Sequence, residues 1–385
     1  MQMKSEFMTV LLTILLMVLI VVLGFFGVIA YQEIFGETGN TEVKSYVSTY
    51  NETVDSSDNL KEQNKVIKEN WKDKLSQLIS SITNSEEKPP KAEYSEVKVD
   101  KYFYNQLNDY SKIIYRAFES NKEQMKTGTA QIDLGSTFTD VLNQENGDKK
   151  LGEYYQSAVE TYLYDNPDVF YISANKLYIN IETTTRRKST TYNVFINNGE
   201  QPNYFTDDFS SESEVREAIT KVEQIKNQII AAKTNNIYYN IKMIHDYLID
   251  TIEYDTTVSK KGIYNIYGAL VEREGVCEAY AKAFKYLADE IGIPCVMVIG
   301  QGTNSDGRTE NHAWNYVEID KKWYAVDCTW DDPVIIGNGK IGSDVRYRYF
   351  LRGSNTMNKD HEVSGQFTDD GNTYTYPTLE YSDYR

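Results

Sequence analysis

The hydrophobic and polar positions change period several times along the chain, and the first change comes near its start. Residues 7–31 carry no charge and are long enough to cross a bilayer as one helix. Lys4 precedes this segment, whereas Glu33 and Glu37 follow it, and this bias predicts an N-terminus in the cytoplasm. We therefore expect a cytoplasmic end at 1–7, an uncleaved transmembrane anchor at 8–31, and the rest of the chain outside the cell. A cleaved signal peptide is the alternative, although its apolar region would be shorter, usually about 7–15 residues.

Residues 32–93 are largely polar, with one helical stripe of apolar side chains. The stripe consists of Leu60, Ile67, Trp71, Leu75, Leu78 and Ile82. This spacing predicts a short stalk helix or a weak coiled coil, through which two chains could associate. Two prolines in the stretch SEEKPPKAEY then end the helix, so this part of the chain is expected to be a stalk and linker.

Helical and strand-like patterns alternate in residues 94–233. The stretches KLYINIE and TYNVFIN are rich in residues typical of strands, and the polar residues between them predict a hairpin. Farther along, Ser211 and Glu214 form a Ser-x-x-Glu capping signal at the start of a helix. We interpret this range as an α+β accessory region without recognisable chemistry.

Residues 236–352 have a different order: an amphipathic helix comes first, then a second helix, and then three strands. The second helix begins near Cys277, and Gly292 is placed to end it. The strands are IPCVMVIGQG, HAWNYVEI and WYAVDCTW, joined by a loop at 302–311 and a DKK turn. A helix followed by an antiparallel meander predicts the α+β class. Residues 353–385 are expected to be a polar C-terminal extension.

Composition narrows the functional classes. The net charge of −17 argues against a nucleic-acid backbone as the partner. Three cysteines cannot all pair within the chain, so a disulfide scaffold is excluded and at least one thiol is free. The stretch GQGTNSDG has no helix after it, so it does not match a phosphate-binding loop. Neither a cofactor nor a metal ion is expected.

One cysteine, one histidine and one aspartate occupy positions suited to nucleophilic catalysis. Cys277 lies in the first turn of its helix, where the helix dipole and free N–H groups are expected to lower the thiol pKa. His312 begins a strand after a flexible loop, and Asp327 lies in the next strand across a tight turn, so the two side chains can approach each other. An aspartate there would orient the imidazole toward the thiol.

Other interpretations of these residues stay open. Cys277 could be a small buried hydrophobe, and Cys328 is expected to be one because it alternates with Asp327 along the strand. A zinc site could be built from the three cysteines and His312, although no C-x-x-C pair supports it. His245 lies beside the apolar face of its helix and is interpreted as a core histidine.

Four ordered blocks of this region resemble the transglutaminase-like domain that transglutaminases share with related bacterial proteins and cysteine proteases. The blocks are G-V-C-E-x-Y-A, G-I-P-C-x-x-V-x-G, H-A-W-N-x-V and W-Y-x-V-D-x-T-W-D-D-P. The resemblance implies a papain-like fold in which Cys277 is the nucleophile, His312 the base and Asp327 the orienting acid. Ala279 departs from the pattern, since many bacterial members have glycine there. Residues 347–362 also resemble the stretch that follows the core, which implies a structural role for His361.

Candidates for the rest of such a site follow from the same region. The backbone N–H of the nucleophile is one expected oxyanion donor. The second is expected from the loop before the helix, where Tyr267, Tyr264 and Asn265 are the candidates. Trp314 and Trp330 flank the histidine and the aspartate along the chain and are expected to form cleft walls.

We therefore expect a cysteine-dependent enzyme that is held at the cell membrane by a single span, with its catalytic domain outside the cell. It would attack a peptide or isopeptide bond and hydrolyse it in preference to transferring the acyl group. The expected partner is a protein or peptide substrate, including one associated with the cell wall. Protein cross-linking by acyl transfer to an amine is the first alternative. A non-catalytic surface scaffold or binding protein is the second.

Overall fold

The computed structural model describes residues 40–48, 101–186, 189–258, 260, 262–305, 307–332, 343–365 and 373–385. The anchor expected at 8–31 and the stalk helix expected around Trp71 lie outside these residues. Within the described part of the chain, no helix is long and apolar enough to cross a membrane.

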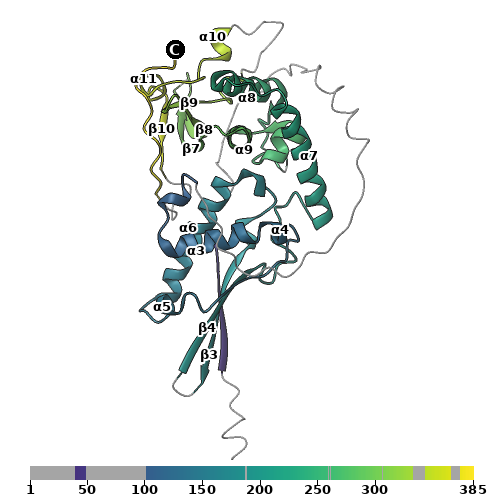
Figure 1. Cartoon of the computed structure of the whole chain (residues 1–385), viewed down its shortest axis with the longest axis vertical. Helices are drawn as coiled ribbons and strands as arrows, with labels where there is room; N and C mark the ends of the chain where they lie inside the picture. Colours follow the sequence, from purple (N-terminus) through teal and green to yellow (C-terminus); the bar gives the residue numbers. More distant parts are fainter. Residues whose placement is uncertain are drawn as a thin grey trace, which may run out of the picture.

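Two four-stranded antiparallel sheets organise the described chain (Figure 1). The first has the order β1 (Asn40–Val47), β3 (Tyr178–Arg186), β4 (Ser189–Asn197) and β2 (Ile132–Gly135). β3 and β4 pair as a hairpin, which confirms the prediction from KLYINIE and TYNVFIN. β1 pairs residue for residue with β3 along its whole length. This pairing corrects the expectation that all of residues 32–93 are stalk and linker.

Helices pack against this first sheet and form the accessory part of the core. They are α3 (Asp109–Ser120), α4 (Lys122–Met125), α5 (Thr139–Leu142) and α6 (Gly147–Asp165), with the 3-10 turns η2 (Tyr104–Gln106), η3 (Pro167–Val169) and η4 (Ala174–Lys176). α3 begins where the Asn108 side chain accepts a hydrogen bond from the Ser111 N–H. Its apolar face packs Tyr115 and Phe118 against Tyr162 of α6.

The long helix α7 (Glu212–Ile230) leads from the accessory part toward the second sheet. The Ser211 hydroxyl accepts from the Glu214 N–H at 3.3 Å, and the Glu214 carboxylate accepts from the Ser210 N–H at 2.7 Å. The capping signal predicted at this position is therefore confirmed. Along its buried face, α7 packs against α9 of the second half.

The second sheet has the order β10 (His361–Val363), β7 (Cys295–Thr303), β8 (Thr309–Ile319) and β9 (Lys322–Val326). α9 (Cys277–Ile291) packs on β7 and β8, and α8 (Ile237–Thr251) packs on α9 (Figure 1). The remaining short elements are β5 (Glu253–Tyr254), η5 (Gly268–Glu272), β6 (Glu274–Gly275), α10 (Ser343–Arg346) and α11 (Ser354–Met357). This helix-on-sheet arrangement confirms the predicted α+β class.

α9 is buried along nearly its whole length. Its many alanines let neighbouring elements approach closely, and its two buried lysines are each paired one turn along. Lys282 contacts Glu278 and Lys285 contacts Asp289, each at 2.8 Å. Gly292 follows with φ +81°, a left-handed conformation that glycine adopts without strain, and it ends the helix as predicted.

The C-terminal segment is part of the fold, which corrects the expectation of a polar extension at 353–385. β10 pairs with β7, and Leu379 forms a bridge with Trp323 of β9. The Tyr374 ring packs on Phe103 of the accessory part with centroids 5.1 Å apart. The segment therefore connects the two halves. Its strand β10 covers the edge of β7, and its Tyr374 ring packs on an aromatic ring of the accessory part.

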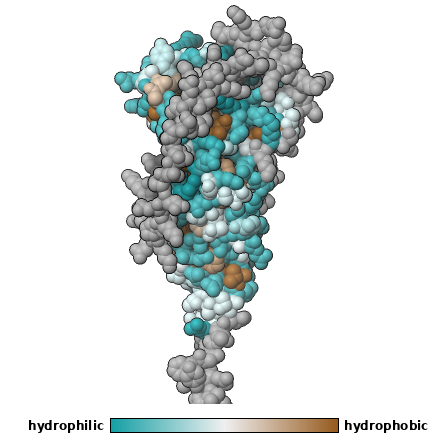
Figure 2. Space-filling view, turned by 90° about the vertical axis from the view of Figure 1, so that its right-hand side faces the viewer, coloured by the Kyte–Doolittle hydropathy of each residue, from teal (hydrophilic) through white to brown (hydrophobic). Residues whose placement is uncertain are grey.

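The surface is mostly hydrophilic, as Figure 2 shows for one face. Large apolar side chains that are exposed in the described residues are scattered among different elements; they are Val43, Val47, Ile237, Tyr239, Val345, Val363 and Tyr381. Single exposed apolar residues of this kind are ordinary on a protein surface.

Candidate active site

Cys277 is the first residue of α9, and its thiol is buried, with 1 % of the residue exposed. Burial raises the pKa of this thiol to about 12, although backbone hydrogen bonds from Ala313 and Glu278 favour the thiolate. The expectation that the helix start lowers the thiol pKa is therefore wrong, because loss of hydration outweighs the N–H groups. A thiol with a raised pKa needs a base to take its proton.

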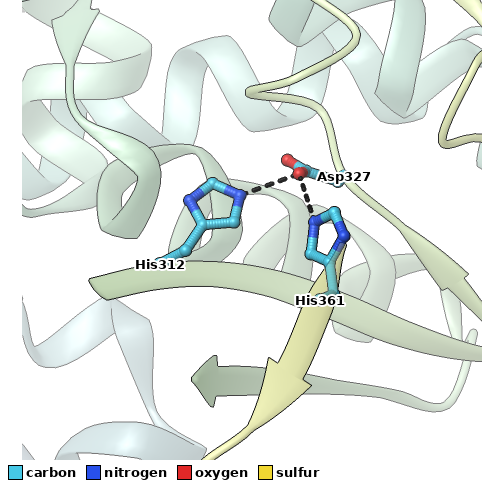
Figure 3. Close-up of side chains that lie close together, drawn as sticks. All are labelled: His312, Asp327 and His361. Carbon is cyan, nitrogen blue, oxygen red and sulfur yellow. Dashed lines mark hydrogen bonds and ion pairs between the residues drawn. The ribbon is translucent and has the colours of Figure 1, made fainter. Parts of the chain in front are cut away.

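His312 and Asp327 are brought together by the pairing of β8 with β9. Asp327 follows β9 directly, and Val326 at the end of that strand pairs with Asn315 of β8. The His312 Nε2 and Asp327 Oδ2 atoms are 2.8 Å apart, and both residues are buried (Figure 3). The predicted contact between these two side chains is confirmed.

The Asp327 carboxylate is held at both oxygens. Oδ1 accepts hydrogen bonds from the backbone N–H groups of Thr329 and Trp330, at 2.9 and 3.1 Å. Oδ2 contacts His312 and also His361. Burial by itself favours the neutral acid, but the two histidines outweigh it and hold the pKa of Asp327 well below its usual range. Asp327 is therefore an anion whose position is fixed from four directions.

The Cys277 sulfur lies beside Ala313, the residue that follows His312 on β8. Ala313, whose backbone N–H bonds the Cys277 thiol, is the next residue after His312 on β8. Because Nε2 of His312 faces the carboxylate, Nδ1 is the ring nitrogen that can exchange a proton with a thiol; in Figure 3 this nitrogen points away from Asp327. The fold thus gathers Cys277, His312 and Asp327 in one buried place.

Two tryptophans enclose the imidazole of His312. The Trp314 and Trp330 rings lie nearly parallel to it, with centroids 5.8 and 5.1 Å away. Trp314 is fully buried, whereas Trp330 is partly exposed. Both rings therefore keep water from the histidine, and Trp330 is the one that solvent or a ligand can reach.

The candidate oxyanion donors have other contacts. The Tyr267 ring stacks on Phe170 and meets Phe209 edge to face, and both phenylalanines belong to the accessory part. Asn265 caps the turn before η5, because its Oδ1 accepts from the N–H groups of Tyr267 and Gly268. These contacts give Asn265 a structural role, and the assignment of Tyr267 as an oxyanion donor stays a prediction.

His361 was interpreted as structural, and the structure places it at the site. Its Nε2 is 3.1 Å from Asp327 Oδ2 and its Nδ1 is 2.8 Å from Asp360 Oδ1 (Figure 3). The sequence signal was the dipeptide Asp360–His361 after the four motif blocks, which puts a carboxylate next to one of only three histidines. His245 of α8, the other histidine outside the triad, lies buried between Asp246 of the same helix and Asp331, and it is a core residue as predicted.

Metal-ligand atoms also meet here. Within the described residues, one group of three is close enough to hold an ion: His312, Asp327 and His361, whose nitrogen and oxygen atoms lie within 4.8 Å of one another. Hydrogen bonds account for this approach, so we describe the group as a hydrogen-bonded network. The three cysteines are free and buried, and in the described part of the chain none belongs to a group of this kind.

Comparison with known proteins places the site in a class. Residues 223–328 match the sequence model of the transglutaminase-like superfamily. The chain therefore carries a transglutaminase-like domain over these residues, which include Cys277, His312 and Asp327. No curated protein matches the chain.

The solved structures that match the chain share little sequence with it. One described as a TGase is 13% identical, with 48% of this chain and 51% of that chain covered and a TM-score of 0.27. A candidate cysteine protease from Cytophaga hutchinsonii is 15% identical, with 40% and 57% covered and a TM-score of 0.24. The periplasmic domain of TgpA from Pseudomonas aeruginosa is 14% identical, with 40% and 72% covered and a TM-score of 0.24. The chain thus spans about half the length of the first two structures.

Proposed function

We propose that the chain is a cysteine-dependent enzyme that attacks amide bonds in peptides or proteins through Cys277, His312 and Asp327. The observation that carries this proposal is the 2.8 Å contact between His312 and Asp327 beside the cysteine that begins α9. A buried, oriented imidazole next to a thiol is the arrangement that nucleophilic catalysis by cysteine requires.

The chemical steps follow from the raised thiol pKa. His312 takes the proton of Cys277 as the sulfur attacks the carbonyl carbon, and the carbonyl electrons move onto oxygen. The backbone N–H of Cys277 is the first donor to that oxygen. When the C–N bond breaks, the proton on His312 passes to the departing amine. Water or a second amine then attacks the resulting thioester while His312 takes a proton from it. As the C–S bond breaks, His312 passes this proton to the sulfur and the thiol is restored.

We propose that the reaction ends in hydrolysis and that the catalytic domain lies outside the cell. The uncharged segment 8–31 supports a single membrane anchor with the catalytic domain outside the cell, where proteins and peptides, including those of the cell wall, are the substrates. The alternatives of cross-linking and of a non-catalytic scaffold become outcomes of one experiment.

The experiment incubates the full chain with a peptide library and identifies products by mass spectrometry, with and without an added primary amine. Cleaved peptides that gain the mass of water support hydrolysis, whereas products that carry the added amine support transfer. A Cys277→Ala variant is the matched control and should give neither product. If wild type and Cys277→Ala give the same products, the enzyme proposal fails.

A further inference from the structure

Two carboxylates enclose the ring of His361. Asp327 lies 3.1 Å from Nε2 and Asp360 lies 2.8 Å from Nδ1. A carboxylate at neutral pH can only accept hydrogen bonds, so each contact needs a proton on the nitrogen that faces it. The geometry is therefore that of a doubly protonated imidazolium, with both ring N–H groups donating.

Aromatic rings surround the same side chain. The centroids of Trp330, Trp314 and Tyr349 lie 4.5, 5.0 and 5.2 Å from that of His361. The Tyr349 hydroxyl also donates to the second oxygen of Asp360, at 2.8 Å. These rings keep His361 away from bulk water, so its charge depends on the two carboxylates. Burial alone disfavours the charge, yet the bonds to Asp327 and Asp360 outweigh it and raise the pKa of His361.

We propose that His361 is a cationic positioning residue that shares Asp327 with His312 and helps the Cys277–His312 pair to lose a proton. This inference rests on the proposed function of that pair. The charged and titratable groups around His361 are Asp327 after β9, Asp360 before β10, His312 on β8 with its ring centroid 5.6 Å away, and the Tyr349 hydroxyl. Asp327 thus contacts both imidazoles, whereas Asp360 contacts that of His361.

The His361 charge favours proton loss from the pair whether the proton leaves Cys277 or His312. Loss of a proton from either Cys277 or His312 lowers the charge of the pair by one, and a nearby positive charge favours that loss. Without the His361 cation, the pair holds its proton to higher pH.

The test measures the rate of Cys277 alkylation by iodoacetamide against pH, followed by peptide mass spectrometry, so it needs no known substrate. In a His361→Gln variant the midpoint of the profile should move to higher pH by about one pH unit. The matched control is His245→Gln, which removes an equally buried histidine that is also held by two aspartates. Its midpoint should stay at the wild-type pH.

A purely structural role would give a different pattern. A looser site would change the alkylation rate by the same factor at every pH, and an unchanged midpoint in folded His361→Gln would overturn the inference. Nitrogen NMR of the wild-type histidine rings provides a measurement that needs no variant. Both ring nitrogens of His361 should carry protons at pH 7, and a neutral ring would contradict the proposal.

A different alkylation result would show that the proposed function itself fails. If His312→Ala leaves the alkylation profile of Cys277 unchanged, the pair does not act together and the proposed function fails. If His312→Ala changes the profile but His361→Gln does not, only the role of His361 is rejected.

Discussion

At the scale of single residues, the site depends on how one carboxylate is shared. Asp327 accepts two backbone N–H groups at Oδ1 and faces two imidazoles at Oδ2. The contact of His312 with Asp327 was predictable, because two positions on adjacent antiparallel strands are neighbours once the turn between them is recognised. The raised pKa of the Cys277 thiol was not predictable, since it depends on how completely distant parts of the chain cover the sulfur.

Replacing Asp327 by asparagine tests the shared carboxylate. The amide keeps the size of the side chain but loses the charge that orients His312 and stabilises its protonated form. We expect the rate of peptide turnover to fall by roughly 10²- to 10⁴-fold, as in other triads that lose this charge. Cys328→Ala, at the neighbouring buried position, serves as the control and should retain most of the activity. An Asp327→Asn enzyme that is folded and fully active would contradict the role given to the carboxylate.

At the scale of elements, the second sheet positions a site residue that lies outside the four motif blocks. β10 pairs His361 with Gly302 of β7, and this pairing delivers the imidazole to Asp327. A three-residue strand that joins a sheet more than fifty residues after its partner has no local periodicity to identify it. The sequence therefore predicted three strands at β7, β8 and β9 but left β10 in a polar extension. Their ends differ, because β8 begins at Thr309, before His312, and β9 ends at Val326, so that Asp327 follows the strand. The predicted strand IPCVMVIGQG already contains both glycines of GQG, and both belong to the end of β7.

A glycine makes the approach of β10 possible. A Cβ atom at Gly300 would collide with the backbone carbonyl oxygen of Glu362 and would lie 2.8 Å from the Trp314 ring. Gly300→Ala should therefore displace β10, lower the stability by about 1–3 kcal/mol and move the Cys277 alkylation profile as His361→Gln does. Thermal unfolding and the alkylation assay measure the two effects.

The matched control for this change is Gly307→Ala in the loop between β7 and β8. An added Cβ there meets open space, although φ of +76° makes the substitution mildly strained. We expect a loss of about 1–2 kcal/mol and no change in the alkylation midpoint. Equal effects of the two substitutions on alkylation would argue that β10 does not position the site.

At the scale of the whole molecule, the C-terminal segment joins the accessory part to the catalytic sheet. Tyr374 packs on Phe103, and its hydroxyl is 2.5 Å from that of Thr161 in α6. The α+β class was predictable from the change of pattern along the chain, and the division near residue 236 stays a prediction. The contact between the halves was not, because it forms between single aromatic residues that are far apart in sequence.

Removing the Tyr374 ring tests this connection. Tyr374→Ala leaves a cavity between the halves and removes one hydrogen bond of Thr161, whose hydroxyl keeps its bond to the Ser157 carbonyl. We expect a loss of about 3 kcal/mol in the free energy of unfolding. The control is Tyr381→Ala in the same segment, where 67% of the residue is exposed and the loss should be within about 0.5 kcal/mol. Chemical denaturation measures both, and equal losses would show that the segment is not part of the joint core.

The covalent intermediate on Cys277 tests the central claim most directly. Wild-type protein is mixed with the peptide library, quenched in acid within milliseconds to seconds, and its mass is measured intact and after digestion. The account predicts an acyl adduct on Cys277 that is absent in Cys277→Ala and strongly reduced in His312→Ala. Product formation without any adduct on Cys277, or adducts that persist in Cys277→Ala, would contradict it.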